Sequence, residues 1–183
     1  MKKKIKICLI GSWRNYSKEA RKGAKLLGEW VAERNHSLVT GACLGIPHEA
    51  AKACHKKKGH SIGYSPANSS KYHLKKHGLA KGGFTEIIYM DEKEHLSYSK
   101  RNIINIKNSD IVILISGKLG AINEYTIAMD MKKPVFVLEG VGNASDLIRN
   151  IEKSLYGKAK SHICTSIKEL LIELEKYIVK HFD

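Results

Sequence analysis

Residues 111–115, Ile111-Val112-Ile113-Leu114-Ile115, decide the fold of this 183-residue chain. The run is apolar at every position, whereas a strand with one face in solvent would alternate apolar and polar residues. Continuous apolarity predicts a central strand of a parallel sheet, buried on both faces. Gly117 and Gly120 follow directly and predict a turn between this strand and the next helix.

Away from this strand, short apolar runs alternate with longer stretches in which apolar residues recur at helical spacing. Further strands are expected at residues 6–10, 37–40, 60–64, 86–90, 134–138 and 162–164. Helices are expected at residues 18–34, 46–57, 94–108, 120–131 and 146–155 and from 166 onward, with a long polar connection over 67–85. This alternation predicts an α/β, Rossmann-like, doubly wound and mostly parallel sheet of about seven strands flanked by helices. No repeat or linker interrupts it, so residues 1–183 are expected to form a single domain.

The charge of the chain favours anionic partners. Lys and Arg number 32 against 18 Asp and Glu, which gives a formal net charge of +14. Such a surplus attracts phosphorylated ligands or nucleic acid, although a lysine-rich surface without a specific partner would give the same count. No apolar run is long enough for a signal peptide or a membrane span, so a cytoplasmic protein without a membrane partner is expected.

The cysteines and histidines indicate neither a disulfide framework nor a metal site. The four cysteines include no CxxC pair, and Cys8 and Cys164 lie in apolar runs where a thiol acts as a small hydrophobic group. Only His73 and His77 have the spacing that would let a helix present two metal ligands. No carboxylate or thiol accompanies them, so both are expected to be solvated, and no metal or cofactor is expected.

Three glycine turns are expected at one edge of the sheet: Gly11-Ser12, residues 41–45 and residues 117–120. Each follows a predicted strand and precedes a predicted helix. In open α/β sheets ligands bind beyond the carboxyl ends of the strands, and the amide groups at a helix start favour a phosphate. Ordinary turn chemistry would explain a single glycine, but three such turns favour a phosphate-binding site.

Arg101 and Glu124 flank the central strand and its glycine turn. They could be surface charges. As functional groups, Arg101 would orient a phosphate or a sugar hydroxyl, and Glu124 would transfer a proton or stabilise positive charge. Carboxylates stabilise oxocarbenium-like transition states, so the pair suits cleavage of an N-glycosidic bond.

This segment resembles the LOG family, the cytokinin-activating nucleoside 5′-monophosphate phosphoribohydrolases often labelled lysine decarboxylases. Its hallmark is an arginine, an aspartate before the strand, and PGGxGTxxE. Arg101, Asp110, Gly117, Gly120 and Glu124 stand at the matching spacing.

Other segments resemble a divergent prokaryotic branch of the same superfamily, namely residues 40–46, 62–66 and 138–142. The chain departs from the family pattern at several positions: Ser116 replaces proline, Lys118 replaces glycine, Ala121 replaces threonine, Asn102 replaces lysine, and Ala42 and Cys43 replace glycines. Without the threonine hydroxyl, one hydrogen bond to a phosphate is missing, worth about 1–3 kcal/mol.

The turns and the resemblance together predict the site. Arg101 and Glu124 are the predicted catalytic residues. The predicted ligand-binding residues are Gly11, Ser12, Gly41, Ala42, Cys43, Gly45, Gly117, Lys118, Gly120, Ala121 and Asn123.

Three functions remain open at this point. The first is hydrolysis of a nucleoside 5′-monophosphate to free base and ribose 5-phosphate. The second is binding of a nucleotide or nucleotide-derived signal without turnover. The third is nucleic-acid binding, because the superfamily includes DNA-processing protein A, but few aromatic residues accompany the basic ones. A dinucleotide-dependent dehydrogenase is excluded because the first turn lacks GxGxxG. The resemblance also implies a homo-oligomer, a dimer or higher.

Overall fold

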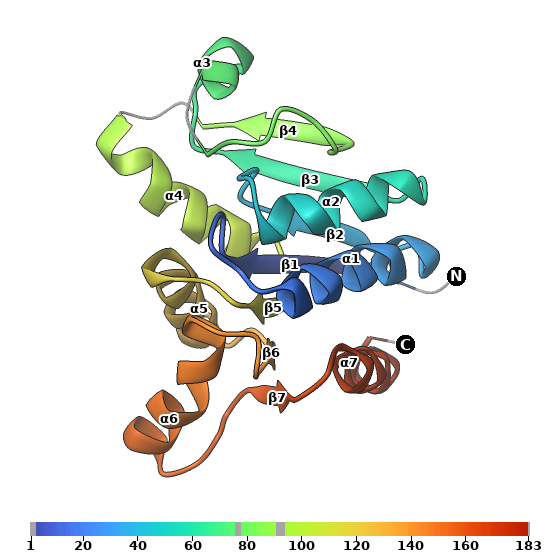
Figure 1. Cartoon of the computed structure of the whole chain (residues 1–183), viewed down its shortest axis with the longest axis vertical. Helices are drawn as coiled ribbons and strands as arrows, with labels where there is room; N and C mark the ends of the chain where they lie inside the picture. Colours follow the sequence, from blue (N-terminus) through green and yellow to red (C-terminus); the bar gives the residue numbers. More distant parts are fainter. Residues whose placement is uncertain (1–2, 76–77, 91–93, 183) are drawn as a thin grey trace.

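The computed structural model describes residues 3–75, 78–90 and 94–182, and within them seven parallel strands form one sheet (Figure 1). The strands are β1 (Lys6–Gly11), β2 (Ser37–Thr40), β3 (His60–Ser65), β4 (Glu86–Tyr89), β5 (Ile111–Ile115), β6 (Val135–Leu138) and β7 (His162–Cys164). The helices are α1 (Lys18–Glu33), α2 (Ile46–Lys56), α3 (Ser70–Lys75), α4 (Glu94–Lys107), α5 (Leu119–Asp130), α6 (Ala144–Tyr156) and α7 (Ile167–His181). The predicted α/β, Rossmann-like sheet is confirmed.

The strand order is β4-β3-β2-β1-β5-β6-β7. From β1 the chain runs outward to β4, returns to the middle, and runs outward again from β5 to β7. The order therefore reverses between β1 and β5, which are paired in register from Ile7 with Ile111 to Gly11 with Ile115. A reversal of this kind leaves a crevice at the carboxyl ends of the two strands.

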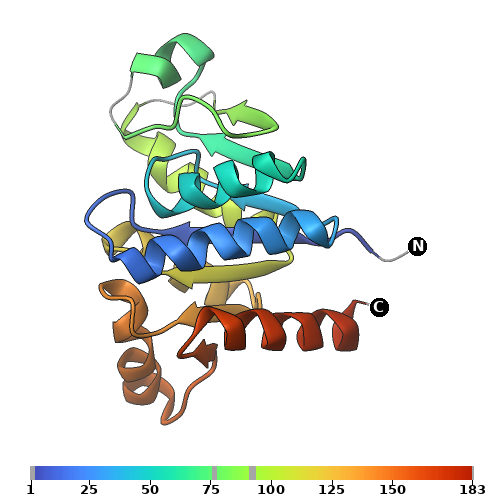
Figure 2. The same ribbon diagram turned by 45° about the vertical axis from the view of Figure 1, so that its right-hand side comes forward.

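Two hydrophobic layers hold the sheet between helices (Figures 1 and 2). On one face α1, α2 and α7 pack against side chains such as Leu9, Ile113 and Phe136. On the other face α4, α5 and α6 pack against side chains such as Ile10, Leu114 and Val137. All five residues of β5 are buried, as its unbroken apolar run predicts.

Local signals account for the start of α1 and of α2. The Ser17 hydroxyl accepts a hydrogen bond from the Ala20 amide and caps α1, and Pro47 stands in the first turn of α2, where its missing amide proton costs no hydrogen bond. The long polar connection departs from the prediction because it contains the short helix α3. Its residue His73 anchors that segment.

His73 is therefore not solvated, contrary to the sequence-based prediction. Its ring is 2% exposed, and its two nitrogens lie 2.8 Å from the Ser65 hydroxyl and 2.7 Å from the Ala80 carbonyl oxygen. These two hydrogen bonds satisfy the buried imidazole, which the histidine spacing alone could not reveal. His77 lies outside the described residues.

Within residues 3–75, 78–90 and 94–182, no helix is both long enough and apolar enough to cross a membrane. In the same ranges no three His, Cys, Asp or Glu side chains gather as a metal-binding group. Cys8, Cys54 and Cys164 are buried free thiols, and Cys43 is a half-buried one.

Candidate functional site

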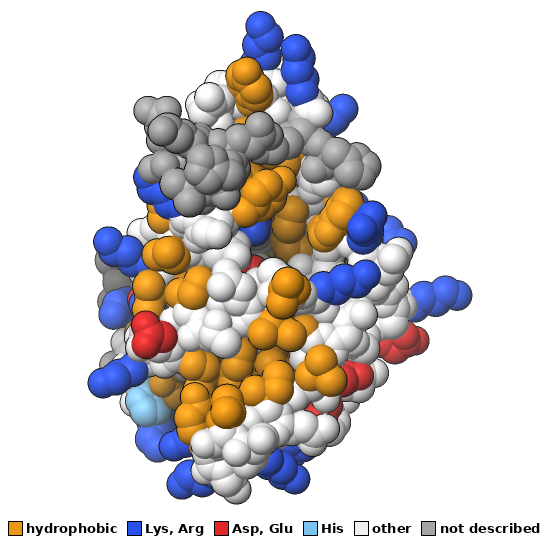
Figure 3. Space-filling model, turned by 90° about the vertical axis from the view of Figure 1, so that its left-hand side faces the viewer, with side chains coloured by type: hydrophobic (Ala, Val, Ile, Leu, Met, Phe, Trp, Pro, Cys, Tyr) orange, Lys and Arg blue, Asp and Glu red, His pale blue; other side chains and the backbone are white. Residues whose placement is uncertain are grey.

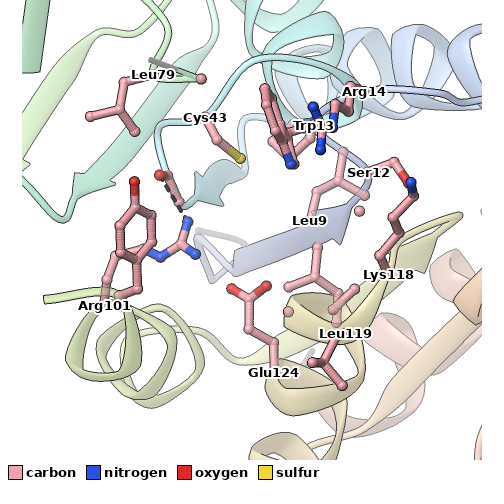
Figure 4. A pocket seen from close by; sticks show the side chains of 18 residues that line it. Leu9, Ser12, Trp13, Arg14, Cys43, Leu79, Arg101, Lys118, Leu119 and Glu124 are labelled. Carbon is pink, nitrogen blue, oxygen red and sulfur yellow. Dashed lines mark hydrogen bonds between the residues drawn. The ribbon is translucent and has the colours of Figure 1, made fainter. Parts of the chain in front are cut away.

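A cavity of about 410 Å³ opens where the strand order reverses, at the carboxyl ends of β1, β2 and β5 (Figure 4). A volume of this size suits a small-molecule ligand. Residues from five segments of the sequence form its wall: Leu9, Ile10, Gly11, Ser12, Trp13, Arg14, Gly41, Cys43, Pro47, Gly78, Leu79, Tyr98, Arg101, Lys118, Leu119, Gly120, Ala121 and Glu124.

Arg101 reaches the cavity from α4 and is fixed against the turn after β2. Its Nη1 donates to the Gly41 carbonyl oxygen at 3.0 Å, and its Nη2 donates to the Asn102 side-chain oxygen at 2.8 Å. A Cβ atom at position 41 would lie 1.7 Å from Nη1. Only glycine therefore leaves room for the guanidinium, which explains why Gly41 and Arg101 belong to one site.

The guanidinium of Arg101 and the carboxyl group of Glu124 are both buried. The residues are 9% and 7% exposed, so the explanation of the pair as surface charges is wrong. Burial raises the pKa of Glu124 above its usual value, and the charge of Arg101 and a hydrogen bond from Asn105 only partly oppose this. The Glu124 carboxyl group points into the cavity (Figure 4) and can hold a proton at a higher pH than an exposed glutamate.

Asparagines connect α4 to α5 beside the charged pair. The Asn102 amide donates to the Asn123 side-chain oxygen at 2.8 Å, and the Asn105 amide donates to Oε1 of Glu124 at 2.9 Å. Two buried atoms in this region have no hydrogen-bond partner, the Arg101 Nε and the Asn105 Oδ1. Unpartnered polar atoms of this kind are uncommon in folded proteins and mark a place where another group can bind.

The turn between β5 and α5 forms the opposite wall. Ser116 and Gly117 have positive φ angles of 61° and 105°, and the Gly117 amide donates to the Ser12 hydroxyl at 2.9 Å. This bond fixes the turn against the β1 loop. Lys118 is the N-cap of α5 and provides no side-chain capping bond. The Ala121 amide donates to the Lys118 carbonyl oxygen at 2.9 Å, whereas the Leu119 and Gly120 amides have no acceptor among the described residues and are available to an anion.

An aromatic and cationic lip borders the cavity on the β1 side. The Arg14 guanidinium lies over the Trp13 ring, 4.4 Å from its centroid, and Gly78 packs against the same indole. Among the described residues, neither Arg14 nor Lys118 pairs with a carboxylate. Two cations of this kind at one end of a cavity attract an anionic group.

The structure brings most of the predicted site residues to one cavity. Those on its wall are Gly11, Ser12, Gly41, Cys43, Arg101, Lys118, Gly120, Ala121 and Glu124. Four others lie outside the wall and have structural contacts instead: Ala42, Gly45, Gly117 and Asn123. Gly45 packs against the Trp13 backbone, and the Ala42 carbonyl oxygen accepts from the Ala80 amide at 2.9 Å.

Sequence reasoning missed several wall residues. Arg14, Leu79, Tyr98 and Leu119 carry no motif that ties them to a ligand. Leu79 is placed on the wall by an isolated antiparallel bridge to Cys43. The two residues are 36 positions apart in the sequence, and no local pattern predicts their pairing. The sequence gives one weak indication of Asn105: it lies one helical turn after Arg101, so the two side chains are on the same face of the helix.

The family model of the SLOG cluster4 family matches residues 4–171. The chain belongs to the SLOG cluster4 family. An uncharacterized protein of Archaeoglobus fulgidus is 28% identical over 145 residues, which cover 76% of this chain and 87% of the relative. Membership in the LOG family itself is not shown, so the finer resemblance stays a prediction.

Solved structures support the same superfamily. The molybdenum cofactor binding protein of Rippkaea orientalis is 25% identical, with a TM-score of 0.77 and coverage of 97% of this chain and 98% of that one. The molybdenum cofactor carrier protein of Chlamydomonas reinhardtii is 19% identical, with a TM-score of 0.72 and coverage of 97% and 99%. DNA processing protein A of Helicobacter pylori, described as binding single-stranded DNA, is 21% identical, with a TM-score of 0.69 and coverage of 94% and 81%. The last two likenesses show the fold alone.

Proposed function

We propose that this SLOG protein binds a small phosphorylated ligand with a planar ring, of the nucleoside 5′-monophosphate class, in the cavity between β1 and β5. The observation that carries the proposal is that three kinds of chemical group line the same cavity. These are the open helix start with Lys118, the buried Arg101–Glu124 pair, and the apolar and aromatic surface of Trp13, Leu79 and Leu119.

Each chemistry suits one part of such a ligand. The first-turn amides of α5 and the Lys118 ammonium group would hold the phosphate. The indole of Trp13 and the side chain of Leu79 would contact the ring. The Arg101–Glu124 pair would then face the sugar and the bond that joins it to the ring.

Titration calorimetry tests this proposal directly. Purified protein is titrated with AMP, GMP, CMP and UMP, and with adenosine and inorganic phosphate as partial ligands. The expected result is saturable one-to-one binding of at least one nucleotide, which weakens strongly when either the ring or the phosphate is removed. Heat that appears only with inorganic phosphate, or no saturable heat with any compound, would contradict the proposal.

A second candidate function, hydrolysis of the N-glycosidic bond, is favoured by the buried position of Glu124 beside Arg101. The carboxyl group is buried, its pKa is raised, and it faces the cavity. It could protonate the leaving base, or as a carboxylate it could stabilise the positive charge that develops on the sugar. Water then adds to the anomeric carbon, so that nucleotide and water give free base and ribose 5-phosphate.

Chromatographic detection of free base separates the two candidates. Hydrolysis predicts base release by the native protein and its loss in Glu124→Gln, with nucleotide affinity retained. Recovery of intact nucleotide from a saturated complex would leave binding without turnover. A molybdenum cofactor and single-stranded oligonucleotides belong in the same screen, because relatives of this fold are described as binding them.

We also propose self-association. Figure 3 shows hydrophobic side chains gathered on one face, over the lower half of the molecule. Helices α5 and α6 carry exposed apolar residues, among them Leu119 at 81% and Leu155 at 67% exposure. Exposed apolar patches commonly mark protein interfaces. Light scattering at several concentrations is expected to give a mass of at least two chains, and a constant monomer mass would contradict this.

A further inference from the structure

We propose that Asn105 is the positioning residue for Glu124 and holds this carboxyl group toward the cavity in both of its protonation states. This inference deepens the proposed hydrolytic function, on which its catalytic meaning rests. The contact itself and its effect on Glu124 can be tested without ligand.

The first observation is the geometry of the pair. Asn105 is completely buried on α4, and its Nδ2 donates to Oε1 of Glu124 at 2.9 Å. No other hydrogen bond to the Glu124 carboxyl group occurs among the described residues. The amide therefore holds one carboxyl oxygen and leaves Oε2 for the cavity, into which the group points (Figure 4).

The second observation is the unpartnered Oδ1 of Asn105. A buried amide oxygen without a donor is costly unless it is used in another state. Rotation of the side-chain amide by about 180° exchanges its nitrogen and oxygen. In that orientation the oxygen can accept the proton of a neutral Glu124, whereas in the observed orientation the nitrogen donates to the carboxylate. One side chain can thus hold both forms.

Asn105 also differs from the titratable groups around Glu124. Those groups are Arg101 on α4, Cys8 on β1 and Cys43 after β2. Arg101 favours the carboxylate through its charge but is bound to Gly41 and Asn102 rather than to Glu124. Within the described part of the chain only Asn105 forms a hydrogen bond to the carboxyl group, so it controls orientation, while Arg101 acts through its charge.

A general acid that later acts as a base needs this property. During the proposed cleavage Glu124 gives a proton to the leaving base and must regain one from water before the next cycle. A carboxyl group that is hydrogen-bonded in only one protonation state would lose its orientation in the other. Asn105 would keep Oε2 in place throughout.

The test follows the carboxyl carbon of Glu124 by ¹³C NMR as a function of pH in ligand-free protein. Glu124→Gln identifies the resonance by its disappearance. The test variants are Asn105→Leu, which removes the amide, and the isosteric Asn105→Asp, which removes the donors and adds a competing carboxyl group. Asn108→Leu is the matched control, because Asn108 directly follows α4 and its side-chain amide donates to the Ile104 carbonyl oxygen rather than to Glu124.

The expected result is a Glu124 titration midpoint that moves to higher pH in Asn105→Leu and further in Asn105→Asp, because the bond that Nδ2 donates to the charged carboxylate is stronger than the one that Oδ1 would accept from the neutral acid. In Asn108→Leu it stays at the native value. A folded Asn105→Leu or Asn105→Asp variant whose midpoint coincides with that of Asn108→Leu would overturn the proposal. Should Asn105→Leu fail to fold, Asn105→Asp carries the decision because it keeps the shape of the side chain.

Base release measured in the same variants distinguishes this inference from the proposed function. If hydrolysis occurs, the acid limb of the kcat/KM profile is expected to move with the Glu124 midpoint. If no base is released while the midpoint still moves, the hydrolytic function fails and the positioning role of Asn105 stands.

Discussion

Two glycine turns at the same sheet edge look alike in sequence and differ in structure. The turn after β5 contains Gly117 and Gly120, and the turn after β6 contains Gly140 and Gly142. In the β6 turn, the amides of Gly140 and Gly142 donate to the two carboxyl oxygens of Asp146 at 2.8 and 3.0 Å. In the β5 turn, the Gly117 amide donates to the Ser12 hydroxyl, and the Leu119 and Gly120 amides at the start of α5 have no acceptor among the described residues.

The difference comes from one position in the first helical turn. Asp146 is the third residue of α6, and the equivalent residue of α5 is Ala121. A carboxylate there fills the anion site of the β6 turn from within the chain. Alanine leaves the β5 turn open to an external anion. A glycine turn is therefore a ligand site only where no neighbouring side chain already satisfies its amides.

The largest effect is expected when a carboxylate is placed at position 121, the equivalent of Asp146. In Ala121→Asp the β5 turn should resemble the β6 turn, because the new carboxylate takes the amides and repels a phosphate. We expect nucleotide affinity to fall at least about 100-fold, the equivalent of losing two charge-assisted hydrogen bonds. Calorimetry measures it, with the neutral Ala121→Asn as control; equal affinities of the two variants would contradict the charge argument.

Gly41→Ala changes the opposite wall of the cavity, where Arg101 lies, and leaves the β5 turn unchanged. A methyl group at position 41 occupies the place of the Arg101 guanidinium, which must then leave its bond to the Gly41 carbonyl oxygen. We expect the free energy of unfolding to fall by about 1–3 kcal/mol, with a marked loss of nucleotide affinity. Urea denaturation and calorimetry check both. Unchanged stability would show that Arg101 is not confined by Gly41.

Asp146→Ala tests the other side of the comparison. Loss of the internal carboxylate leaves the Gly140 and Gly142 amides without acceptors, so the free energy of unfolding should fall by about 1–2 kcal/mol. Nucleotide affinity should stay native, since this turn does not line the cavity. A loss of affinity at full stability would place the ligand at the β6 turn and reverse our assignment.

A smaller effect is expected from Lys118→Met, which keeps the length of the side chain and removes its charge. The ammonium group is exposed, so its contribution to phosphate binding should be modest, about two- to fivefold in affinity. The difference between variant and native protein should shrink as salt is raised. A difference that does not depend on salt would mean that Lys118 acts through packing.

The smallest effect concerns pH and stability. Because the pKa of Glu124 is raised in the folded state, folding takes up protons between the unfolded and folded pKa values. The contribution of Glu124 to stability is therefore present at low pH and lost as pH rises through the folded pKa. Urea denaturation from pH 4 to 8 should show native protein losing stability relative to Glu124→Gln with rising pH. A constant difference would contradict the raised pKa.

The sequence predicted the architecture well because the fold depends on periodic burial. The unbroken apolar run at 111–115 identified the central strand, and strand–helix alternation predicted all seven strands along the chain, whereas their order in the sheet came from the structure. The segment from 67 to 85 was less well predicted. Its anchor, His73, is held by Ser65 and Ala80, and both partners are identified only after the chain has folded back.

The candidate site was predictable in part for the same reason. Glycine turns and the Arg101–Glu124 spacing are local signals, and the structure brings them to one cavity. Sequence could not separate residues that line the cavity from residues that support it. Gly117 was predicted to bind ligand, yet its amide is bound to Ser12. Leu79 was missed because its position depends on the long-range bridge to Cys43.

The most direct test of the central claim follows backbone amides by ¹⁵N NMR during titration with AMP, or with the nucleotide that binds best in the calorimetric screen. We predict saturating shifts at Leu119 and Gly120 in the β5 turn, with little change at Gly140 and Gly142 in the β6 turn. Saturating shifts at Gly140 and Gly142 without shifts at Leu119 and Gly120 would contradict the account, as would changes spread over surface lysines without saturation.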